Sequence, residues 1–497
     1  MPRYGQFLYG DELYGATPDT DAMLWAFQVA WDGSYTGAWS SGTFNNEALR
    51  MVDLTVTRGR DYMLRADGRG FEPFPPGVAV GIFDNWDGRY DPWNTSSPLY
   101  PNVKPGKFCK ILSTDGAGGT TRPIMYGIID DIQPVMRGRA PFARIVIHDG
   151  LQWLMDKTIL IGLQSNIDKW DAVKRVRTAA GMLSLPWTWI SYVYPSLTEE
   201  YPYWWAWQQN AWEAIQQINI AEGSHLIHSA GGNIKWLPRE LTYPATTNLD
   251  QSEVLADIAI QQPWEHIRNE VRVVSYPLLY DTVNTTLWEL QDTPAIANGE
   301  AFSVDARFRY STWQPCGASI TFNHTVNTAA DGSGTNMTAS CPLTYNTDIG
   351  EGAQITVTNN YGSAGYITLL RAVGDAIYPP YVATRKASDA TSEAAYGYRS
   401  LELDSRWAGD TVLAQEMADW LLAELKDPIP QPVVQIENRH SLQFGYDVYD
   451  RVVFTAAKLG ISSQNYRIGK IEHRWLEENG QAVRTLWKLE PYLTPFA

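Results

Sequence analysis

Alternating hydrophobic and polar positions dominate the first third of the chain. Residues 25–31 and 51–57 alternate with a period of two, and the apolar runs at 124–129 and 143–148 have the length of strands. Glycine- and proline-containing turns separate these runs. Because many short strands with such turns are typical of a barrel or a sandwich, residues 24–160 are predicted to form a first β-barrel.

The next segment changes to a helical period. One helix is predicted to begin at Asp168 or Asp171, either of which could cap it. A second is predicted from about 210 to 222, where Gly223 ends it. A β-hairpin and a further strand follow. Residues 161–297 therefore form an α+β middle segment in this interpretation.

The remaining chain divides into two parts. Residues 298–378 are poor in charge and rich in Thr, Asn and Ser, which favours an inserted β-sandwich of immunoglobulin or carbohydrate-binding type. Residues 379–497 hold the clearest helix, at about 409–425, and then strands that end in a second β-barrel. The predicted fold class is mainly β with α+β segments: two β-barrel domains, a helical middle section and an inserted β-sandwich.

Residues 1–23 form a separate N-terminal arm in which tyrosine–glycine pairs recur. A terminal arm of this kind more often docks on a neighbour than folds alone. Tyr4, Tyr9 and Tyr14 are therefore interface candidates. The arm has neither a basic region nor an apolar core like those of a secretion signal, so we expect a soluble protein made in the cytoplasm.

Residues 79–112 open as a buried strand, continue as a long loop, and re-enter a strand near residue 107. Prolines and turn dipeptides stiffen the loop. A loop of this length with many aromatic residues is usually functional or part of an interface. Its interface candidates are Trp86, Tyr90, Trp93 and Tyr100.

Three aspartates crowd the start of this loop and raise the question of a calcium site. Asp84, Asp87 and Asp91 do not follow the D-x-[DN]-x-[DN]-G-x5-E pattern, and Gly88 is misplaced for it. We therefore interpret the three carboxylates as turn formers.

The other candidate metal-binding and catalytic residues are poorly supported by the sequence. His225 and His228 are three apart on a predicted strand, which places them on opposite faces, so they are interpreted as structural. Glu270 is the best of the poor candidates for a glycosidase carboxylate. The sequence also lacks the phosphate-loop, nucleophile-elbow and zinc-protease motifs. We expect no enzyme, no catalytic residue, no metal site and no cofactor.

The length, charge and residue composition favour some classes of function and argue against others. At 497 residues the chain has room for roughly three domains of about 150 residues each. The net charge of −16 argues against binding nucleic acid through its phosphates. The 21 Trp and 27 Tyr suit interfaces, glycan platforms or β-rich cores. Of the three cysteines, Cys316 and Cys341 could pair, while general cysteine burial favours free thiols.

The run D-G-R-Y-D-P-x-N-x-x-S-P-L-Y-P-N-x-x-P-G-K at residues 87–107 resembles the first barrel domain of bacteriophage tail hub or minor tail proteins. The tyrosine–glycine arm, Tyr396–Gly397 and the hairpin segment 467–474 add to the resemblance. This family is similar in fold to the hub of contractile-tail baseplates. The resemblance implies two related β-barrels, with three copies forming a pseudo-six-fold ring and no catalytic residues.

The implied function is structural: a hub ring at the tail tip of the virion that joins the six-fold tail tube or distal tail ring to three-fold tip components. The implied partners are two further copies, the distal tail protein, tail tube and tape measure proteins, and tail fibre or tip proteins. DNA would be passing cargo, and the acidic charge could line a lumen that repels it. Residues 298–378 could bind a host glycan. The alternatives are a secreted carbohydrate-binding or glycan-degrading protein and a lytic tail-tip enzyme.

Overall fold

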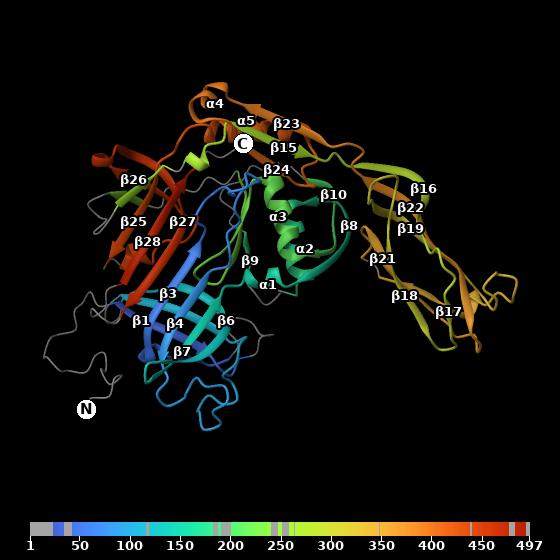
Figure 1. Ribbon diagram of the computed structural model, residues 1–497, viewed down its shortest axis with the longest axis horizontal. Coiled ribbons are helices and arrows are strands. Elements are labelled where there is room, and N and C mark those ends of the chain that lie inside the picture. The colour runs from blue at the N-terminus through green and yellow to red at the C-terminus, as the bar shows by residue number, and fades with distance from the viewer. Residues whose placement is uncertain are drawn as a thin grey trace.

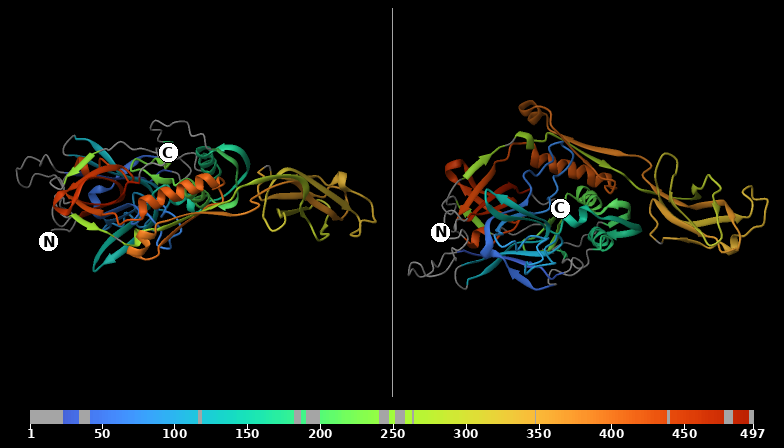
Figure 2. Two further views of the ribbon diagram at one scale, coloured as in Figure 1. Left: turned by 90° about the horizontal axis from the view of Figure 1, so that it is seen from above. Right: turned by 60° about the horizontal axis from the view of Figure 1, so that its bottom comes forward.

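The computed structural model shows a mainly β body from which an elongated β-domain projects (Figures 1 and 2). No helix in the described part of the chain is long and apolar enough to cross a membrane. The structure describes residues 23–33, 42–115, 119–181, 187–189, 200–239, 247–250, 258–262, 264–346, 348–437, 440–476 and 483–493.

A 13-stranded sheet forms the body, and its first half makes the first barrel unit. The strands of this unit run in the order β3-β4-β7-β6-β5-β1-β2, and each neighbouring pair is antiparallel. Alternate side chains point inward and bury a core around Phe27, Leu54 and Phe83. The four strands predicted at 25–31, 51–57, 124–129 and 143–148 are confirmed. The elements are β1 (Met23–Ala30), β2 (Phe44–Asn46), η1 (Ala48–Arg50), β3 (Met51–Gly59), β4 (Val78–Asp84), β5 (Phe108–Asp115), β6 (Thr121–Arg137) and β7 (Ala140–His148).

The other half of the sheet makes the second barrel unit, which encloses a core that includes Val434, Phe454 and Trp487. Two of its strands come from the middle segment: β13 pairs with β26, and β14 pairs with β25. The prediction that this barrel is built from residues 379–497 alone is therefore incomplete. Its elements are β13 (Thr247–Asp250), β14 (Ile258–Gln261), β25 (Gln431–Glu437), α6 (His440–Gln443), β26 (Arg451–Ala456), η4 (Ala457–Leu459), β27 (Ile461–Leu476) and β28 (Val483–Pro491).

The two barrel units are joined where β3 pairs with β27 in antiparallel register, from Lys470 opposite Gly59 to Leu476 opposite Asp53. We call this pairing the seam. The long strand β27 also pairs with β26 and β28, so it belongs to the second unit and to the seam at once. The seam makes one continuous sheet out of two units far apart in sequence.

Buried ion pairs flank the seam. The Arg60 guanidinium donates to both carboxylate oxygens of Glu490, at 3.0 and 2.8 Å. Arg58 donates to the Asp447 carboxylate and to the His228 carbonyl, both at 2.6 Å. Such bidentate, desolvated contacts fix geometry more than they add stability. They tie the end of β3 to the second unit.

The middle segment packs two helices against a two-stranded ladder of β8 and β10. Both predicted helices are confirmed: Asp168 caps α2 by accepting from the Trp170 amide, and α3 ends at Gly223, whose φ of 61° suits glycine. The predicted hairpin is β11 with β12. The elements are α1 (Gln152–Met155), β8 (Thr158–Asp168), α2 (Lys169–Ala179), β9 (Trp187–Trp189), β10 (Glu200–Asn210), α3 (Ala211–Glu222), β11 (His225–His228) and β12 (Ile234–Leu237).

The strongest predicted helix is confirmed as α5, which packs on a three-stranded sheet in the order β23-β15-β24. Asp410 caps α5 by accepting from the Val412 and Leu413 amides. The helix buries Met417 and Leu421 against the sheet, with an exposed face opposite. The elements are η2 (Trp264–His266), β15 (Glu270–Ser275), β23 (Ala383–Ser388), α4 (Ala390–Tyr396), β24 (Ser400–Asp404) and α5 (Thr411–Leu425).

The projecting domain is an inserted pair of sheets around a common core, and it begins at Leu279, not at the predicted residue 298. The earlier start follows from β16, which pairs along β22 over most of its length. Cys316 and Cys341 are both buried and free, so the disulfide alternative is wrong. The elements are β16 (Leu279–Glu289), β17 (Ala295–Ile296), β18 (Ala301–Arg307), β19 (Cys316–Asn327), η3 (Thr338–Ser340), β20 (Leu343–Tyr345), β21 (Gly352–Thr358) and β22 (Gly365–Tyr378).

The seam generates a prediction at Gly59. This residue has φ of 95°, and a Cβ there would lie 2.1 Å from the Gly469 carbonyl oxygen across the seam. Gly59→Ala should therefore lower the free energy of unfolding by about 3 kcal/mol, measured by denaturant titration. Gly460→Ala is the matched control, because φ is 79° there and the space is open, so only backbone strain of about 1 kcal/mol is expected. Equal losses in both variants would contradict close packing at the seam.

Candidate assembly interface

The loop between β4 and β5, residues 85–107, forms the lower end of the first barrel unit in Figure 1. Its backbone folds as a chain of turns, in which amides at 88, 91, 94, 97 and 100 each donate to the carbonyl three residues earlier, at 2.9 to 3.2 Å. Backbone groups in this loop thus find partners within the loop itself. The loop is therefore an ordered structure and not a slack connection.

The three aspartates of the loop start serve the turns, as the sequence predicts. Asp84, Asp87 and Asp91 each accept a hydrogen bond from the backbone amide two residues ahead, at 3.0 to 3.2 Å. Asp87 also receives two hydrogen bonds from the Arg50 guanidinium, at 2.8 and 2.7 Å. Arg50 lies in η1, so this bidentate pair fastens the loop to the chain just before β3.

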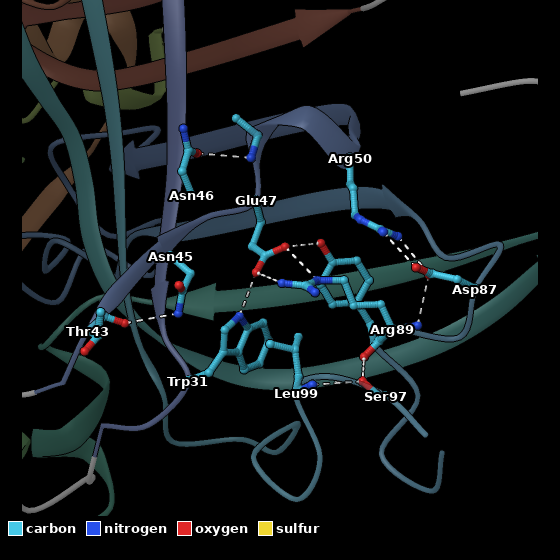
Figure 3. A network of polar contacts seen from close by, with 12 residues as sticks. Trp31, Thr43, Asn45, Asn46, Glu47, Arg50, Asp87, Arg89, Ser97 and Leu99 are labelled. Atoms are coloured by element: carbon cyan, nitrogen blue, oxygen red, sulfur yellow. Dashed lines mark hydrogen bonds and ion pairs between the residues drawn. The ribbon is translucent and has the colours of Figure 1, made fainter. Parts of the chain in front are cut away.

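A buried carboxylate holds the inner face of the loop (Figure 3). Glu47 Oε1 accepts from Trp31 Nε1 at 3.0 Å and from Arg89 Nη2 at 2.8 Å. Glu47 Oε2 accepts from Arg89 Nε at 3.1 Å and from the Tyr90 hydroxyl at 2.8 Å. Four hydrogen bonds from three side chains satisfy both oxygens, which makes this desolvated charge tolerable.

These contacts determine the ionisation of the cluster. Burial opposes the charged form of Glu47, but hydrogen bonds from Arg89, Tyr90 and Trp31 outweigh it and hold the pKa of Glu47 below its usual range. Burial and the adjacent Glu47 charge raise the pKa of Tyr90 well above its usual value. The cluster therefore stays a carboxylate bound by a neutral phenol and a guanidinium at neutral pH.

Three of the four predicted interface residues in the loop lie on its outer face. Trp93 is 80% exposed, Trp86 61% and Tyr100 48%, and Leu49 beside Arg50 is 79% exposed. Tyr90 is the exception: it is fully buried against Phe83, because its hydroxyl is needed by Glu47, so it offers no surface to a partner. Tyr4, Tyr9 and Tyr14 lie outside the described residues.

An exposed aromatic surface on a rigid loop has the chemistry of a protein interface. Large aromatic side chains are enriched at such interfaces, and preorganisation reduces the entropy lost on binding. Sequence reasoning found the aromatic residues but missed Glu47 and Arg50, which hold the loop. No local motif marks them, because both act on residues about forty positions away.

The remaining sequence candidates have structural partners. Glu270 accepts hydrogen bonds from Arg272 and Tyr398 and forms an ion pair with Lys386. Burial opposes its ionisation, but these three partners prevail and lower the pKa of Glu270. His225 is enclosed by the rings of Phe71, Phe74 and Tyr449, and His228 is also buried. Both histidines are structural, as predicted. Among the described residues no group of three or more His, Cys, Asp or Glu is arranged to hold a metal ion.

The Glu47 cluster generates a prediction. Glu47→Gln should lower the free energy of unfolding at pH 7 by about 3 kcal/mol, because it leaves the Arg89 charge without its buried partner. The folded-state pKa of Glu47 lies below the ordinary value of 4.5, so its contribution is present above that value and is lost as the pH falls through the folded-state pKa. The difference between the two proteins should therefore shrink below about pH 4.5.

Trp93→Ala is the control for this prediction, since it removes an exposed side chain of the same loop and should change stability by less than about 0.5 kcal/mol. Chemical denaturation at several pH values measures both variants. A stability difference for Glu47→Gln that stays constant from pH 7 to pH 3 would contradict the ionised cluster.

Comparisons with known proteins place the fold. The chain matches the 43 kDa tail protein of prophage MuSo2 from Shewanella oneidensis with a TM-score of 0.50 and 10% identity, over 94% of this chain and 96% of that one. It matches the tail protein from Neisseria meningitidis MC58 with a TM-score of 0.50 and 10% identity, over 95% and 98% of the two chains. No protein-family model and no curated protein matches the sequence. Both of these solved structures are tail proteins, and the chain shares their mainly β fold, as the 87–107 run implies.

Proposed function

We propose that this protein is a structural component of a viral tail tip, a hub ring of three copies that joins a six-fold tail tube or distal tail ring to three-fold tip components. The shared fold with the tail proteins of Shewanella oneidensis and Neisseria meningitidis supports a place in a tail. The proposed role as a hub ring of three copies rests on the architecture of the chain itself.

The observation that carries the proposal is the continuous sheet through the seam. It holds two barrel units in one chain at a fixed spacing, with β3 and β27 paired over seven residue positions. Three such chains would present six barrel units to a six-fold neighbour. A chain that presents two units in this way reconciles three-fold and six-fold symmetry within one ring.

The outer face of the loop at residues 85–107 suits contact with a neighbouring tail protein. Trp86, Trp93 and Tyr100 are exposed on a loop whose backbone and inner side chains are already fixed. In the proposed ring this surface would meet the distal tail protein, the tail tube or a tip protein, and DNA and the tape measure protein would pass through the lumen. The net charge of −16 would keep DNA phosphates from adhering to the passage.

The proposal assigns no catalytic step to this chain. Glu270, the strongest carboxylate candidate, is held by ion pairs with Arg272 and Lys386 and by a hydrogen bond from the Tyr398 hydroxyl. A carboxylate neutralised in this way is poorly suited to act as a general acid. The role is therefore mechanical, in a virion tail assembled from proteins made in the host cytoplasm.

Light scattering on the purified chain tests the ring. We expect a mass of about three times the 55.9 kDa of one chain, and ring-shaped particles by negative-stain microscopy. A strict monomer at high protein concentration would contradict the ring. A dimer would contradict it too, because two chains present four barrel units instead of six.

The inserted domain is proposed to bind a host glycan. It extends away from the body in all three ribbon views, and its exposed rings include Tyr345 at 46% and Tyr361 at 43% exposure. Tyr345 lies 4.5 Å from Phe322 between ring centroids, which gives an apolar surface for the face of a sugar ring.

Glycan-array binding of the full chain tests this role. We expect binding to at least one bacterial surface glycan, weakened at least tenfold by Tyr345→Ala, which removes the ring that stacks on the sugar. Tyr62→Ala is the control, because that ring is 44% exposed on the body and outside the inserted domain. Absence of binding, or equal loss in both variants, would contradict the glycan role.

A further inference from the structure

A short β-hairpin projects from the first barrel unit beyond the rest of its sheet. The last residue of β6 that pairs with β5 is Ile128, opposite Phe108, and β6 then continues to Arg137 with only β7 beside it among the described strands. In the left view of Figure 2 the teal ribbon of this hairpin extends from the body at the lower left. We call residues 133–140 the arm, which is a different segment from the N-terminal arm at residues 1–23.

The arm is exposed and basic. Every residue from 133 to 140 is exposed except the half-buried Val135, and Met136 is 66% exposed. The arm carries Arg137 and Arg139 and no acidic residue, whereas the whole chain has a formal charge of −16 and therefore −18 without these two arginines. An exposed strand with a free edge and an uncovered methionine is a feature that proteins usually protect or use for contacts.

The exposed face of α5 has the opposite character. Val412, Glu416, Asp419 and Ala423 recur at intervals of four, three and four residues and are all exposed. The helix contains three acidic residues and no Lys or Arg. Val412 is 64% exposed, so this face also combines an uncovered apolar side chain with charge. The helix is about 22 Å long, which is enough to receive a short hairpin along its length.

The arm and the α5 face belong to opposite ends of the body. Figure 1 shows β6 and β7 at the lower end and α5 at the upper end, so the arm of one chain cannot contact its own α5. A contact between them must join two molecules head to tail. Repeated around an axis, such a heterologous contact closes into a ring.

We propose that the arm of one chain docks on the exposed face of α5 of the next copy, with Arg137 and Arg139 paired to Glu416 and Asp419 and with Met136 packed against Val412. The inference rests on the proposed ring and adds the contact that closes it. Opposite charge directs the encounter and sets the orientation, and the two apolar side chains supply buried area at the centre. The first barrel unit of one chain is thereby joined to the helical layer of its neighbour.

Charge reversal tests the contact in the full chain. Arg137→Glu with Arg139→Glu places four like charges across the interface, so the dissociation constant of the ring should rise at least tenfold, measured by sedimentation equilibrium. The matched control is Arg307→Glu with Arg309→Glu, two exposed arginines at the same spacing in the inserted domain. It should leave the dissociation constant unchanged. Circular dichroism confirms that each variant is folded.

A charge swap makes the test specific for α5. Adding Glu416→Arg and Asp419→Arg to the arm variant restores opposite charge and should recover most of the lost affinity. The wild-type ring should also weaken as salt rises, since the pairs are exposed.

The outcomes separate the two proposals. If the wild type forms the ring and the arm variant keeps its affinity, or if the swap fails to restore it, the docking inference is overturned while the ring remains. If the wild type is monomeric at high concentration, both the ring and the docking contact are overturned.

Discussion

The antiparallel pairing of β3 with β27 is the constraint on which the rest of the structure depends. Without it the chain would hold two small sheets, each with its own core and an exposed edge. Edge strands are covered when two units share one sheet, and Gly59 allows the backbones to approach where the seam begins. In this arrangement Arg58 and Arg60 reach their carboxylate partners, Asp447 and Glu490, in the second unit. Close backbone packing and the buried ion pairs thus both hold the two units together at the seam.

The surface loop at residues 85–107 is also held in place by buried polar contacts, over a shorter stretch of chain. Its inner side is fastened by one buried carboxylate, and its outer side leaves large rings in solvent. Exposed tryptophans usually cost solubility, so a loop that keeps them rigidly in place is useful when another surface covers them. Because Glu47 precedes β3, the loop, the barrel core and the seam are all anchored on one short stretch of chain. The position of the outer rings is therefore set relative to both barrel units.

Local pattern was enough to predict most strands of the first barrel unit, the helices α2, α3 and α5, and the end of α3 at Gly223, because these depend on neighbours within a few residues. It narrowed the cap of α2 to Asp168 or Asp171, and the structure shows Asp168. It could not assign β13 and β14 to the second barrel unit, since strand pairing across about two hundred residues leaves no local trace. Tyr90 shows the same limit at the site: an aromatic residue in a loop has the same sequence signal whether it faces a partner or a buried glutamate. The tryptophan excess is similar, for Trp204, Trp236 and Trp487 are fully buried.

The proposed ring connects these features. A head-to-tail contact between copies generates a closed ring only when each copy is rotated by a fixed angle, and otherwise it generates an open filament. The arm belongs to the first barrel unit, whereas α5 packs on β15 and β23 and is followed in the chain by β25 of the second unit. The seam is therefore one of the contacts that set the angle between the arm and the proposed docking face on the same chain, together with the packing of Met63, Leu64 and Phe71 beside α5. A flexible seam would let the same arm contact build chains of variable length, so the rigidity of the sheet and the specificity of the assembly are one property.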